Sequence, residues 1–385
     1  MSASESAAEP PPEQHGTPGP TPPPERDATP GPDPAADPSA PSPARGGPVT
    51  ADRIMEIGMG FWPAKALLSA VELGLYPALS EGPRTAAELR DRIGLHPRAA
   101  RDFLDALVAL GLLARDGDGE DGRYANTPET ARFLVPGSPG YLGGFLAMAN
   151  ARLYGFWGRL TDGLRTGRPQ NEIRDRDTPA FDARHADPVR LRMFLQAMTG
   201  LTRSLLPALG EKFPWDRYKS VADIGSGEGS LLGHLVTVFP HLTGVGFDLP
   251  PVGGPFEEFT AAARISDRVR FVPGDFLRDS LPPADVLVFG HILHDWDRDT
   301  KLKLLAKAHD ALPEGGAVIV YESLVDDARR TNAFGLLMSL NMLVETPGGF
   351  DFTAADCRRW LTETGFRSTS ATPLYGPEGM VVGIK

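Results

Sequence analysis

The stretch "VADIGSGEGS", residues 221–230, joins a short apolar run to a helical pattern through three glycines. This order predicts a β-strand that turns sharply into a helix, whose N-terminus offers free N–H donors to a ligand. The spacing is G-x-G-x-G, whereas the loops that receive a pyrophosphate carry G-x-G-x-x-G. Because Asp223 and Glu228 accompany the glycines, the loop favours a ligand that carries positive charge, such as an ammonium or a sulfonium.

Downstream of this loop, short apolar runs alternate with helical stretches. The alternation predicts the α/β fold class, with a mainly parallel sheet and helices on both of its faces. The runs are "GVGFDL", "VRFVPGD", "ADVLVFG" and "GAVIVYES". Only a Gly/Pro turn separates the last two runs, "FRSTSATPLY" and "GMVVGIK", which predicts an antiparallel pair at the edge of the sheet.

Acidic residues stand where two of these strands end. Asp248 closes "GVGFD", 19 residues beyond Gly229, where a carboxylate can accept both hydroxyls of a ribose. Asp275 and Phe276 follow the next strand and suit an adenine amino group and ring. Since ligands of open α/β sheets bind at the carboxyl ends of the strands, we expect these residues and the glycine loop to form one cofactor site.

The stretch "FGHILHDWDRD", residues 289–299, follows the apolar run "ADVLVF". A catalytic base is one interpretation of its histidines. A metal site is another, with His291, His294, Asp295 and Asp297 as ligands and Glu345 as a further one. An ordinary strand end without chemistry is the third. The motif H-x-x-H-D lacks a clear third ligand downstream, so the sequence predicts no metal.

The composition changes abruptly at Val49. Residues 1–48 hold 15 of the 38 prolines and no large apolar side chain after Met1. Such a segment cannot bury enough surface to offset its ordering entropy, so we expect a disordered, solubilising tail. Binding of a partner through a polyproline II helix is the alternative.

Residues 49–140 are predicted to form helices followed by a β-hairpin. The first helical stretch is expected to break near Pro63 and at Gly74. Thr85 is predicted to cap the next helix, with Glu88 completing a capping box.

Helix, turn, helix and hairpin together make a winged-helix arrangement, which reads DNA in many proteins. The second helix, "PRAARDFLDALVALGL", carries Asp102 and Asp105 beside its arginines, with apolar residues filling the rest. A recognition helix needs a basic outer face, so we favour a scaffold or dimerisation role over DNA binding.

Residues 141–210 are predicted to be mostly helical, with a polar loop over 168–179, and residues 211–385 to form the cofactor-binding domain. Large, adaptable side chains are frequent in the helical segment, which suits either core packing or the wall of an aromatic-binding pocket. They are Met148, Asn150, Tyr154, Phe156, Trp157, Phe194 and Met198.

The whole chain narrows the function classes further. Its net charge of −11 argues against binding of nucleic acid. Cys357 is the only cysteine, which excludes an intrachain disulfide and favours a reducing compartment. No apolar run approaches the ~18–20 residues that cross a bilayer, and no secretory signal is visible. We expect a cytoplasmic protein without a membrane partner.

Motifs along the chain resemble those of the S-adenosylmethionine-dependent methyltransferases that act on small aromatic and polyketide-like molecules. Plant caffeic acid and flavonoid O-methyltransferases, hydroxyindole O-methyltransferases and bacterial antibiotic-tailoring enzymes belong to that family. The resemblance covers about residues 50–385. It implies a Rossmann-like class I methyltransferase domain with a seven-stranded sheet, a winged-helix dimerisation domain, a homodimer and S-adenosylmethionine as cofactor. The motifs are "VADIGSGEG", "GFDLP", "GDF", "HILHDW", "GGAVIVYE" and "GMVVGIK".

The resemblance also implies roles for individual residues. His294 falls on the general base, and Glu322 on a carboxylate that orients it. A second such acid aligns with Asp351, where the plant members have a longer glutamate. The cofactor-binding residues are Asp223, Gly225, Gly227, Asp248, Asp275, Phe276 and Gly290. The residues expected to contact the acceptor are Asn150, Met198, Asn341 and Glu345.

We therefore expect an O-methyltransferase that acts on a hydroxyl of a small aromatic or polyketide-type metabolite. A phenol with a pKa of ~10 attacks poorly at neutral pH, so a histidine within hydrogen-bond reach has to remove its proton. The alternatives are a C-methyltransferase acting on an aromatic ring or an α-keto acid, with or without a metal, and a ligand-sensing transcriptional regulator.

Overall fold

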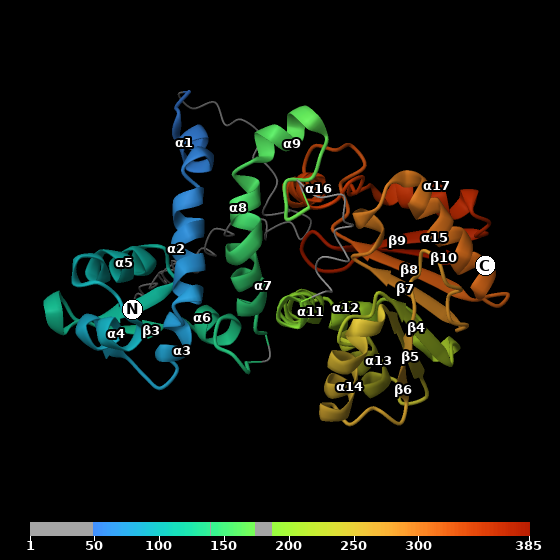
Figure 1. Ribbon diagram of the computed structural model, residues 1–385, viewed down its shortest axis with the longest axis horizontal. Helices are drawn as coiled ribbons and strands as arrows, with labels where there is room; N and C mark the ends of the chain where they lie inside the picture. Colours follow the sequence, from blue (N-terminus) through green and yellow to red (C-terminus); the bar gives the residue numbers. More distant parts are fainter. Residues whose placement is uncertain (1–48, 139, 174–186) are drawn as a thin grey trace, which may run out of the picture. The chain divides into compact units, whose positions relative to one another are not determined.

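The structure is a computed structural model that describes residues 49–138, 140–173 and 187–385 (Figure 1). The tail predicted over residues 1–48 and part of the polar loop predicted over 168–179 lie outside the described residues. No helix in the described part of the chain is both long enough and apolar enough to cross a membrane.

Helices and a small sheet form the N-terminal part. Thr85 and Glu88 make the predicted capping box, which is confirmed. The predicted break at Gly74 is also confirmed, whereas Pro63 lies inside α2 and the break falls at residues 59–60. Proline is tolerated there because the first turn of a helix leaves its N–H groups unpaired anyway. The elements are α1 (Asp52–Gly58), α2 (Phe61–Glu72), α3 (Leu75–Ala78), β1 (Arg84–Thr85), α4 (Ala86–Ile93), α5 (Pro97–Ala109), β2 (Leu113–Asp116), η1 (Gly119–Asp121), β3 (Arg123–Asn126) and α6 (Pro128–Phe133).

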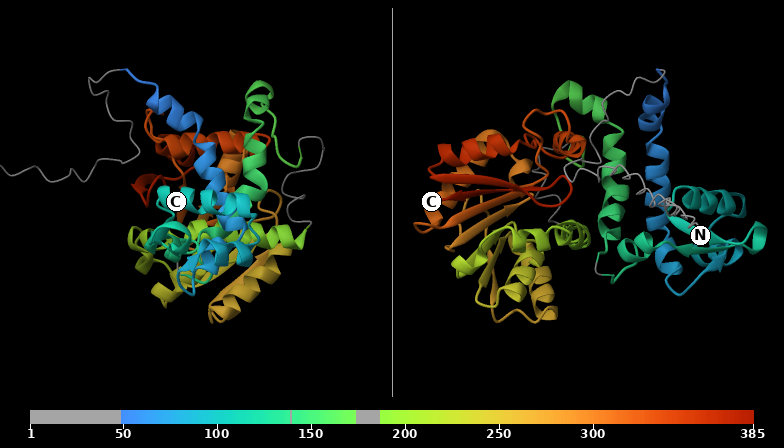
Figure 2. Two further views of the ribbon diagram at one scale, coloured as in Figure 1. Left: turned by 90° about the vertical axis from the view of Figure 1, so that its left-hand side faces the viewer. Right: turned by 180° about the vertical axis from the view of Figure 1, so that it is seen from behind.

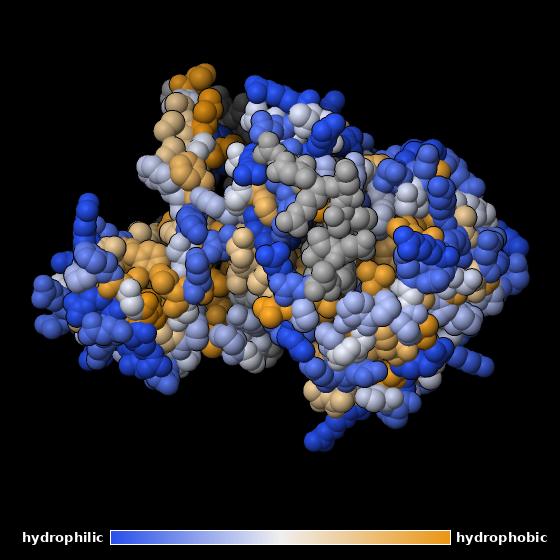
Figure 3. Space-filling view, viewed as in Figure 1, coloured by the Kyte–Doolittle hydropathy of each residue, from blue (hydrophilic) through white to orange (hydrophobic). Residues whose placement is uncertain are grey.

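Helix α1 has no buried residue. Ile54 is 74% exposed, and Phe61 and Trp62 at the start of α2 are 53% and 63% exposed. Figure 3 shows apolar surface along α1. An apolar face of this kind marks an interaction surface more often than a free one.

The next helices connect this part to the sheet. Helix α7 packs against α2 and against α11, and a π-helical turn, η2, joins α7 to α8. Short π-helical turns often occur at functional sites. The elements are α7 (Gly143–Met148), η2 (Ala149–Leu153), α8 (Tyr154–Trp157), α9 (Leu160–Thr166), α11 (Pro188–Arg203), α12 (Leu206–Glu211) and η3 (Trp215–Arg217).

Seven strands in the described residues form the main sheet, in the order β6-β5-β4-β7-β8-β10-β9. The first five in this order are parallel, and β10 runs antiparallel to both β8 and β9. The predicted fold class and the antiparallel pair at the end of the chain are confirmed. The strands are β4 (Ser220–Ile224), β5 (Thr243–Asp248), β6 (Val269–Pro273), β7 (Val286–Gly290), β8 (Ala317–Glu322), β9 (Ser368–Pro373) and β10 (Gly379–Ile384).

Both faces of the sheet are buried, which explains why its central strands are continuous apolar runs. In β7, Val286 and Val288 belong to one hydrophobic cluster, and Leu287 and Phe289 belong to another. Successive side chains point to opposite faces, so the clusters lie on opposite sides of the sheet. Helices α13 (Ser230–Val238) and α14 (Gly253–Ala262) cover one face, and α15 (Arg298–Ala311) and α17 (Ala354–Glu363) cover the other (Figures 1 and 2).

The remaining elements lie around the carboxyl end of β7. Helix α16 contacts α8, α9 and the single turn η5, so it connects the helical segment to the strand end that carries His294. The elements are α13 (Ser230–Val238), η4 (Pro250–Val252), α14 (Gly253–Ala262), η5 (Leu293–Asp295), α15 (Arg298–Ala311), α16 (Ala333–Glu345) and α17 (Ala354–Glu363).

Candidate active site

The glycine loop connects β4 to α13. Gly225, Gly227 and Gly229 have φ angles of 79°, 52° and 86°, in the left-handed region that favours glycine. A Cβ atom at Gly225 would stand 2.3 Å from Ile292 Cδ1, and one at Gly229 would stand 2.7 Å from Phe256 Cε2. The backbone therefore favours glycine at all three positions for its conformation, and at Gly225 and Gly229 also for close packing.

Two of the predicted acids lie against this loop. Asp223 is buried in β4, and burial together with the charge of Asp248 raises its pKa to about 7. Asp248 ends β5, and its Oδ2 accepts a hydrogen bond from the Gly227 N–H at 2.9 Å. Glu228, inside the loop, accepts a hydrogen bond from the Thr199 hydroxyl in α11 at 2.7 Å. Acidic groups therefore surround the loop, and Asp223, with a pKa of about 7, is ionised only in part at neutral pH.

The other predicted cofactor residues follow β6 and end β7. Asp275 and Phe276 are half-buried directly after β6, and the Phe276 ring meets Trp296 edge to face at 5.9 Å. A Cβ atom at Gly290 would stand 1.9 Å from the Tyr321 ring, so only glycine fits there. The parallel pairing of β6, β5, β4 and β7 brings all these residues to one edge of the sheet.

The residues at this edge fit a cationic nucleoside ligand. The glycine loop leaves its backbone open to close approach, and two carboxylates beside it supply negative charge. Ser226 Oγ is buried there without a hydrogen bond from any described residue.

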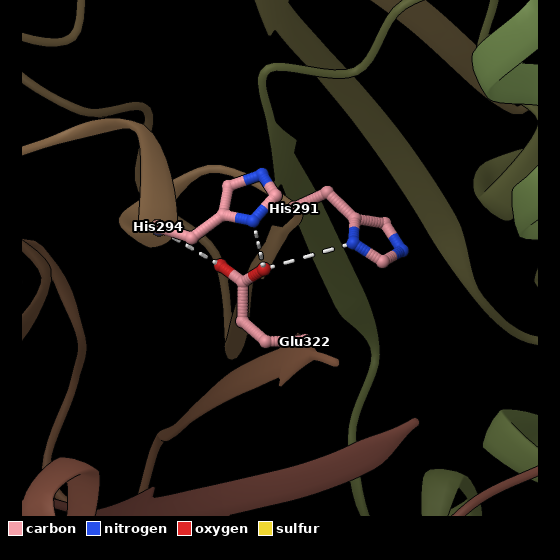
Figure 4. A group of neighbouring side chains, drawn as sticks. All are labelled: His291, His294 and Glu322. Carbon is pink, nitrogen blue, oxygen red and sulfur yellow. Dashed lines mark hydrogen bonds and ion pairs between the residues drawn. The ribbon is translucent and has the colours of Figure 1, made fainter. Parts of the chain in front are cut away.

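His294 lies in η5, shortly after β7, and meets carboxylates from two other segments. Figure 4 shows the one from Glu322. Its Nδ1 is 3.2 Å from Asp351 Oδ1 and 3.5 Å from Glu322 Oε2. Its backbone N–H donates to Glu322 Oε1 at 3.2 Å. Glu322 ends β8, and Asp351 precedes α17, so the structure brings together all three predicted catalytic residues.

The charges in this cluster shift the titration of the imidazole. Burial opposes protonation of His294, but the charges of Glu322 and Asp351 outweigh burial and raise its pKa to about 10. The same coupling lowers the pKa of Glu322 against its burial, whereas burial raises the pKa of Asp351. His294 is therefore a much stronger base than a free imidazole.

A second histidine shares the Glu322 carboxylate. His291 Nδ1 lies 3.6 Å from Glu322 Oε2, and its Nε2 lies 3.8 Å from Glu378 Oε2 in the turn between β9 and β10. The Ser323 hydroxyl donates to the other oxygen of Glu378. His291 has a φ of 53°, a strained conformation that is concentrated at functional sites. Glu378 was not predicted, since nothing in "YGPEGM" signals a buried carboxylate.

Lys301 is a further residue that the sequence did not single out. It is 0% exposed, and its Nζ donates to the carbonyl oxygens of Trp296 and Phe350, the latter at 3.0 Å. These two carbonyls belong to the segments that carry His294 and Asp351. A signal existed, because Lys301 precedes the buried Leu304 and Leu305 by three and four residues, on the apolar side of α15.

Two of the predicted acceptor residues lie on α16. Asn341 Oδ1 accepts a hydrogen bond from Trp157 Nε1 at 2.9 Å. Glu345 is buried and lies 3.1 Å from Arg152 Nη2. Arg152, in the π-helical turn, also pairs with Glu172 at 2.6 Å. These contacts tie α16 to α8 and η2.

The other two predicted acceptor residues lie elsewhere. Asn150 bonds to Lys65 and to Glu72, both at 2.5 Å, and so faces α2. Met198 is half-buried on α11. The contacts of Asn150 do not join it to the His294 cluster.

One group of side chains has the composition of a metal site. Nitrogen and oxygen atoms of His291, His294 and Glu322 lie within 4.8 Å of one another. Asp297 does not take part, because its carboxylate caps α15 by accepting from the Thr300 N–H at 2.8 Å. The carboxylate beside the two histidines is therefore that of Glu322, whereas the sequence had suggested Glu345 as the further ligand.

Comparisons with known proteins agree with this geometry. Residues 157–367 match the model of an O-methyltransferase domain, and residues 55–136 match that of an O-methyltransferase dimerisation domain. The tetracenomycin polyketide synthesis 8-O-methyl transferase TcmO of Streptomyces glaucescens is 42% identical, over 86% of this chain and 96% of its own. The N,N-dimethyltransferase OxyT of Streptomyces rimosus is 37% identical, over 86% and 96%. Human N-acetylserotonin methyltransferase, solved in complex with SAM, superposes with a TM-score of 0.81 at 27% identity, over 89% of this chain and 99% of its own.

Proposed function

The chain belongs to the family of S-adenosylmethionine-dependent O-methyltransferases, and we propose that His294 is the general base that activates a hydroxyl of a polyketide-type aromatic acceptor. The observation that carries the proposal is the position of His294. It lies beside the edge of the sheet that holds the glycine loop, with Nδ1 directed at Asp351 and Glu322.

The cofactor-binding edge is proposed to hold S-adenosylmethionine. Gly225 and Gly227 shape the loop, Asp248 faces the ribose, and Asp275 and Phe276 face the adenine. When bound, the cofactor supplies a methyl carbon that is activated by the adjacent sulfonium. The charges of Asp223 and Asp248 match such a cation, and positioning is the main contribution that the chain makes to an in-line transfer.

His294 is proposed to take the proton from the acceptor hydroxyl through Nε2. Asp351 Oδ1 accepts the Nδ1–H at 3.2 Å, so the neutral ring keeps its lone pair on Nε2. Glu322 adds a second negative charge, which stabilises the imidazolium that forms. Asp351 and Glu322 therefore act as residues that orient the ring and stabilise its charge.

The raised pKa of His294 fits this role. With a pKa of about 10, the deprotonated ring takes a proton from a phenol of pKa ~10 with little change in free energy. At neutral pH only a small fraction of the ring is deprotonated, so the reaction is favoured at higher pH. The side chain is only 8% exposed, so water competes poorly for Nε2.

The acceptor class rests on the relatives. TcmO is described as acting in polyketide synthesis, and an acceptor of that class is proposed here. We propose that the acceptor contacts Met198, Asn341 and Glu345. Asn150 is left out of this set because its side chain bonds to Lys65 and Glu72 on α2.

The chain is also proposed to form a homodimer, with 49–140 as its dimerisation domain, 141–210 as the helical segment and 211–385 as the methyltransferase domain. The match to a dimerisation domain supports this. So does the groove of about 480 Å³ that Phe61, Trp62, Leu73 and Phe103 line on the N-terminal helices. Sedimentation of a Trp62→Glu variant as a monomer would support the dimer, whereas a monomeric wild-type chain would contradict it.

Incubation with isotopically labelled S-adenosylmethionine and a panel of fused-ring phenols with and without an amino group, simple phenols and catechols tests the function. We expect methyl transfer to oxygen, with the fused-ring phenols as the best acceptors. Because OxyT is an N,N-dimethyltransferase, fragmentation of the product has to assign the methyl group. A methyl group on nitrogen or carbon alone would overturn the proposal.

A further inference from the structure

We propose that His291, His294 and Glu322 form a binding site for a divalent transition metal such as Zn²⁺, and that this metal switches off His294 as a base. Metal binding stands on the geometry alone. The switch rests on the function proposed above.

The three ligand atoms lie within 4.8 Å of one another, and Figure 4 shows one ring nitrogen of each histidine facing the same oxygen of Glu322. Glu322 Oε2 lies 3.5 Å from His294 Nδ1 and 3.6 Å from His291 Nδ1. These separations are too long for hydrogen bonds. Ligands bound to one tetrahedral Zn²⁺ at about 2.1 Å stand roughly 3.4 Å apart, which is close to the observed spacing.

Glu322 Oε2 is a buried oxygen without a hydrogen bond from the described residues. Its residue is 1% exposed, and this atom lies between the two imidazoles. Its contacts with the two ring nitrogens are long ion pairs, so a metal ion bound between the three atoms would replace them with direct bonds. Asp351 Oδ1, 3.2 Å from His294 Nδ1, can complete a four-coordinate site.

The surroundings of His291 resemble those of a metal-bound histidine. Its Nε2 faces Glu378 Oε2 at 3.8 Å, and Ser323 holds the other oxygen of Glu378. Metal-ligating histidines usually donate their other ring N–H to such a carboxylate. At 3.8 Å there is no hydrogen bond, so Glu378 favours a proton on Nε2 through its negative charge alone.

The donor set selects the kind of metal. Two imidazole nitrogens with one or two carboxylates suit Zn²⁺, Co²⁺, Ni²⁺ or Fe²⁺. Mg²⁺ and Ca²⁺ prefer ligand sets made of oxygen. A dication would also neutralise Glu322 and Asp351 together, whereas one imidazolium neutralises a single charge.

A metal at Nδ1 of His294 has a chemical consequence. The general base needs its proton on Nδ1 and its lone pair on Nε2. Metal coordination takes the Nδ1 lone pair, so the neutral ring carries its proton on Nε2 and cannot accept another there. Occupancy of this site and base catalysis by His294 therefore exclude each other.

Titration of the purified, chelator-treated full-length chain with Co²⁺ tests the site without an acceptor. We expect one Co²⁺ per chain, visible ligand-field bands of a nitrogen and oxygen site, and displacement by Zn²⁺. His291→Asn should weaken binding by on the order of 100-fold, and Glu378→Gln by about 10- to 100-fold. His241→Asn, a histidine on another part of the chain, should have no effect.

Asn suits position 291 because it tolerates the observed positive φ better than most residues. Unchanged S-adenosylmethionine binding by calorimetry would show that His291→Asn is folded. Wild-type Co²⁺ affinity in that variant would overturn the metal site.

The switch is tested with an accepted phenol. Zn²⁺ should inhibit methyl transfer, a chelator should restore it, and His291→Asn should need roughly 100-fold more Zn²⁺ for the same inhibition. Undiminished turnover with the site filled would overturn the switch. Failure of the proposed function would leave no turnover to inhibit but would not change the Co²⁺ titration, so the two failures are distinguishable.

Discussion

The cofactor edge and the base cluster lie beside each other but are built differently. At the cofactor edge, the backbone conformation of a single segment shapes the binding surface, as at Gly225 and Gly229. In the base cluster, His294, Glu322 and Asp351 come from three segments and act through side-chain charge. The cofactor edge depends on local backbone conformation, whereas the base cluster depends on tertiary contacts between distant segments.

The difference predicts how each site fails. A substitution at the cofactor edge should affect binding, because the backbone that receives the ligand is displaced. A substitution in the base cluster should affect turnover, because the backbone remains in place while a proton acceptor or its field is lost.

The largest effect is expected for His294→Ala. Loss of a general base should reduce kcat by about 10²- to 10⁴-fold, while calorimetry should find S-adenosylmethionine affinity nearly unchanged. His309→Ala, which replaces a histidine on α15 away from the cluster, is the matched control. Equal turnover in the two variants would remove His294 from the mechanism.

The pH dependence should be the next largest effect. Because the pKa of His294 is raised to about 10, the free enzyme carries an imidazolium at neutral pH. The value of kcat/KM should therefore rise roughly tenfold per pH unit toward pH 10, since only the deprotonated ring accepts a proton. A profile that is flat from pH 7 to 9 would contradict the raised pKa.

Stability should change in the opposite direction over the same range. A histidine whose pKa is raised on folding stabilises the chain fully below its unfolded pKa of about 6.5. This contribution is lost as the pH rises toward 10. The difference in unfolding free energy between wild type and His294→Asn should therefore shrink with increasing pH in denaturant titrations.

Gly225→Ala tests the cofactor edge. The new side chain meets positive φ and a Cβ contact of 2.3 Å with Ile292, and strain of this kind costs about 1–3 kcal/mol. Calorimetry should find S-adenosylmethionine bound roughly 10- to 100-fold more weakly, with kcat at saturation less affected. Gly254→Ala is the control, since a Cβ atom there meets nothing within 4 Å.

The same contrast explains what the sequence could predict. The order of strands and helices, the glycine loop and the capping box at Thr85 follow from local patterns, and the structure contains them. Glu322 and Asp351 were reached through resemblance to a family, because no local pattern places them beside His294.

Residues whose role depends on convergence were missed for a physical reason. Glu378 stands in a turn that reads as exposed, and only the pairing of β10 with β8 brings it to His291. The role of Arg152 likewise follows from its contact with Glu345, which lies 193 positions away in the sequence. Spacing within one segment carries no information about either contact.

Lys301→Met tests whether the base cluster can be weakened without affecting the cofactor edge. Lys301 donates to carbonyls on both segments that carry His294 and Asp351, and a hydrogen bond to a charged group contributes about 1.5–3 kcal/mol. We expect the unfolding free energy to fall by about 2 kcal/mol and kcat to fall with little change in cofactor affinity. Lys303→Met, an exposed lysine on the same helix, is the control in the denaturant titrations. If the variant lost cofactor affinity instead, Lys301 would be holding both the base cluster and the cofactor edge in place.

The smallest effect is expected for Thr85→Ala, at a purely local feature far from both sites in sequence. The Thr85 hydroxyl accepts from the Glu88 N–H at 3.2 Å and caps α4. Loss of a threonine cap reduces stability by about 1 kcal/mol. Thr237→Ala is the matched control, because its hydroxyl bonds only to the Gly233 carbonyl within α13 and alanine favours helix. Denaturant titration should separate the two variants by this amount while kcat and cofactor affinity stay at wild-type values. A loss of activity in Thr85→Ala would mean that the N-terminal helices contribute to the active site. The active site would then depend on residues from a further part of the chain.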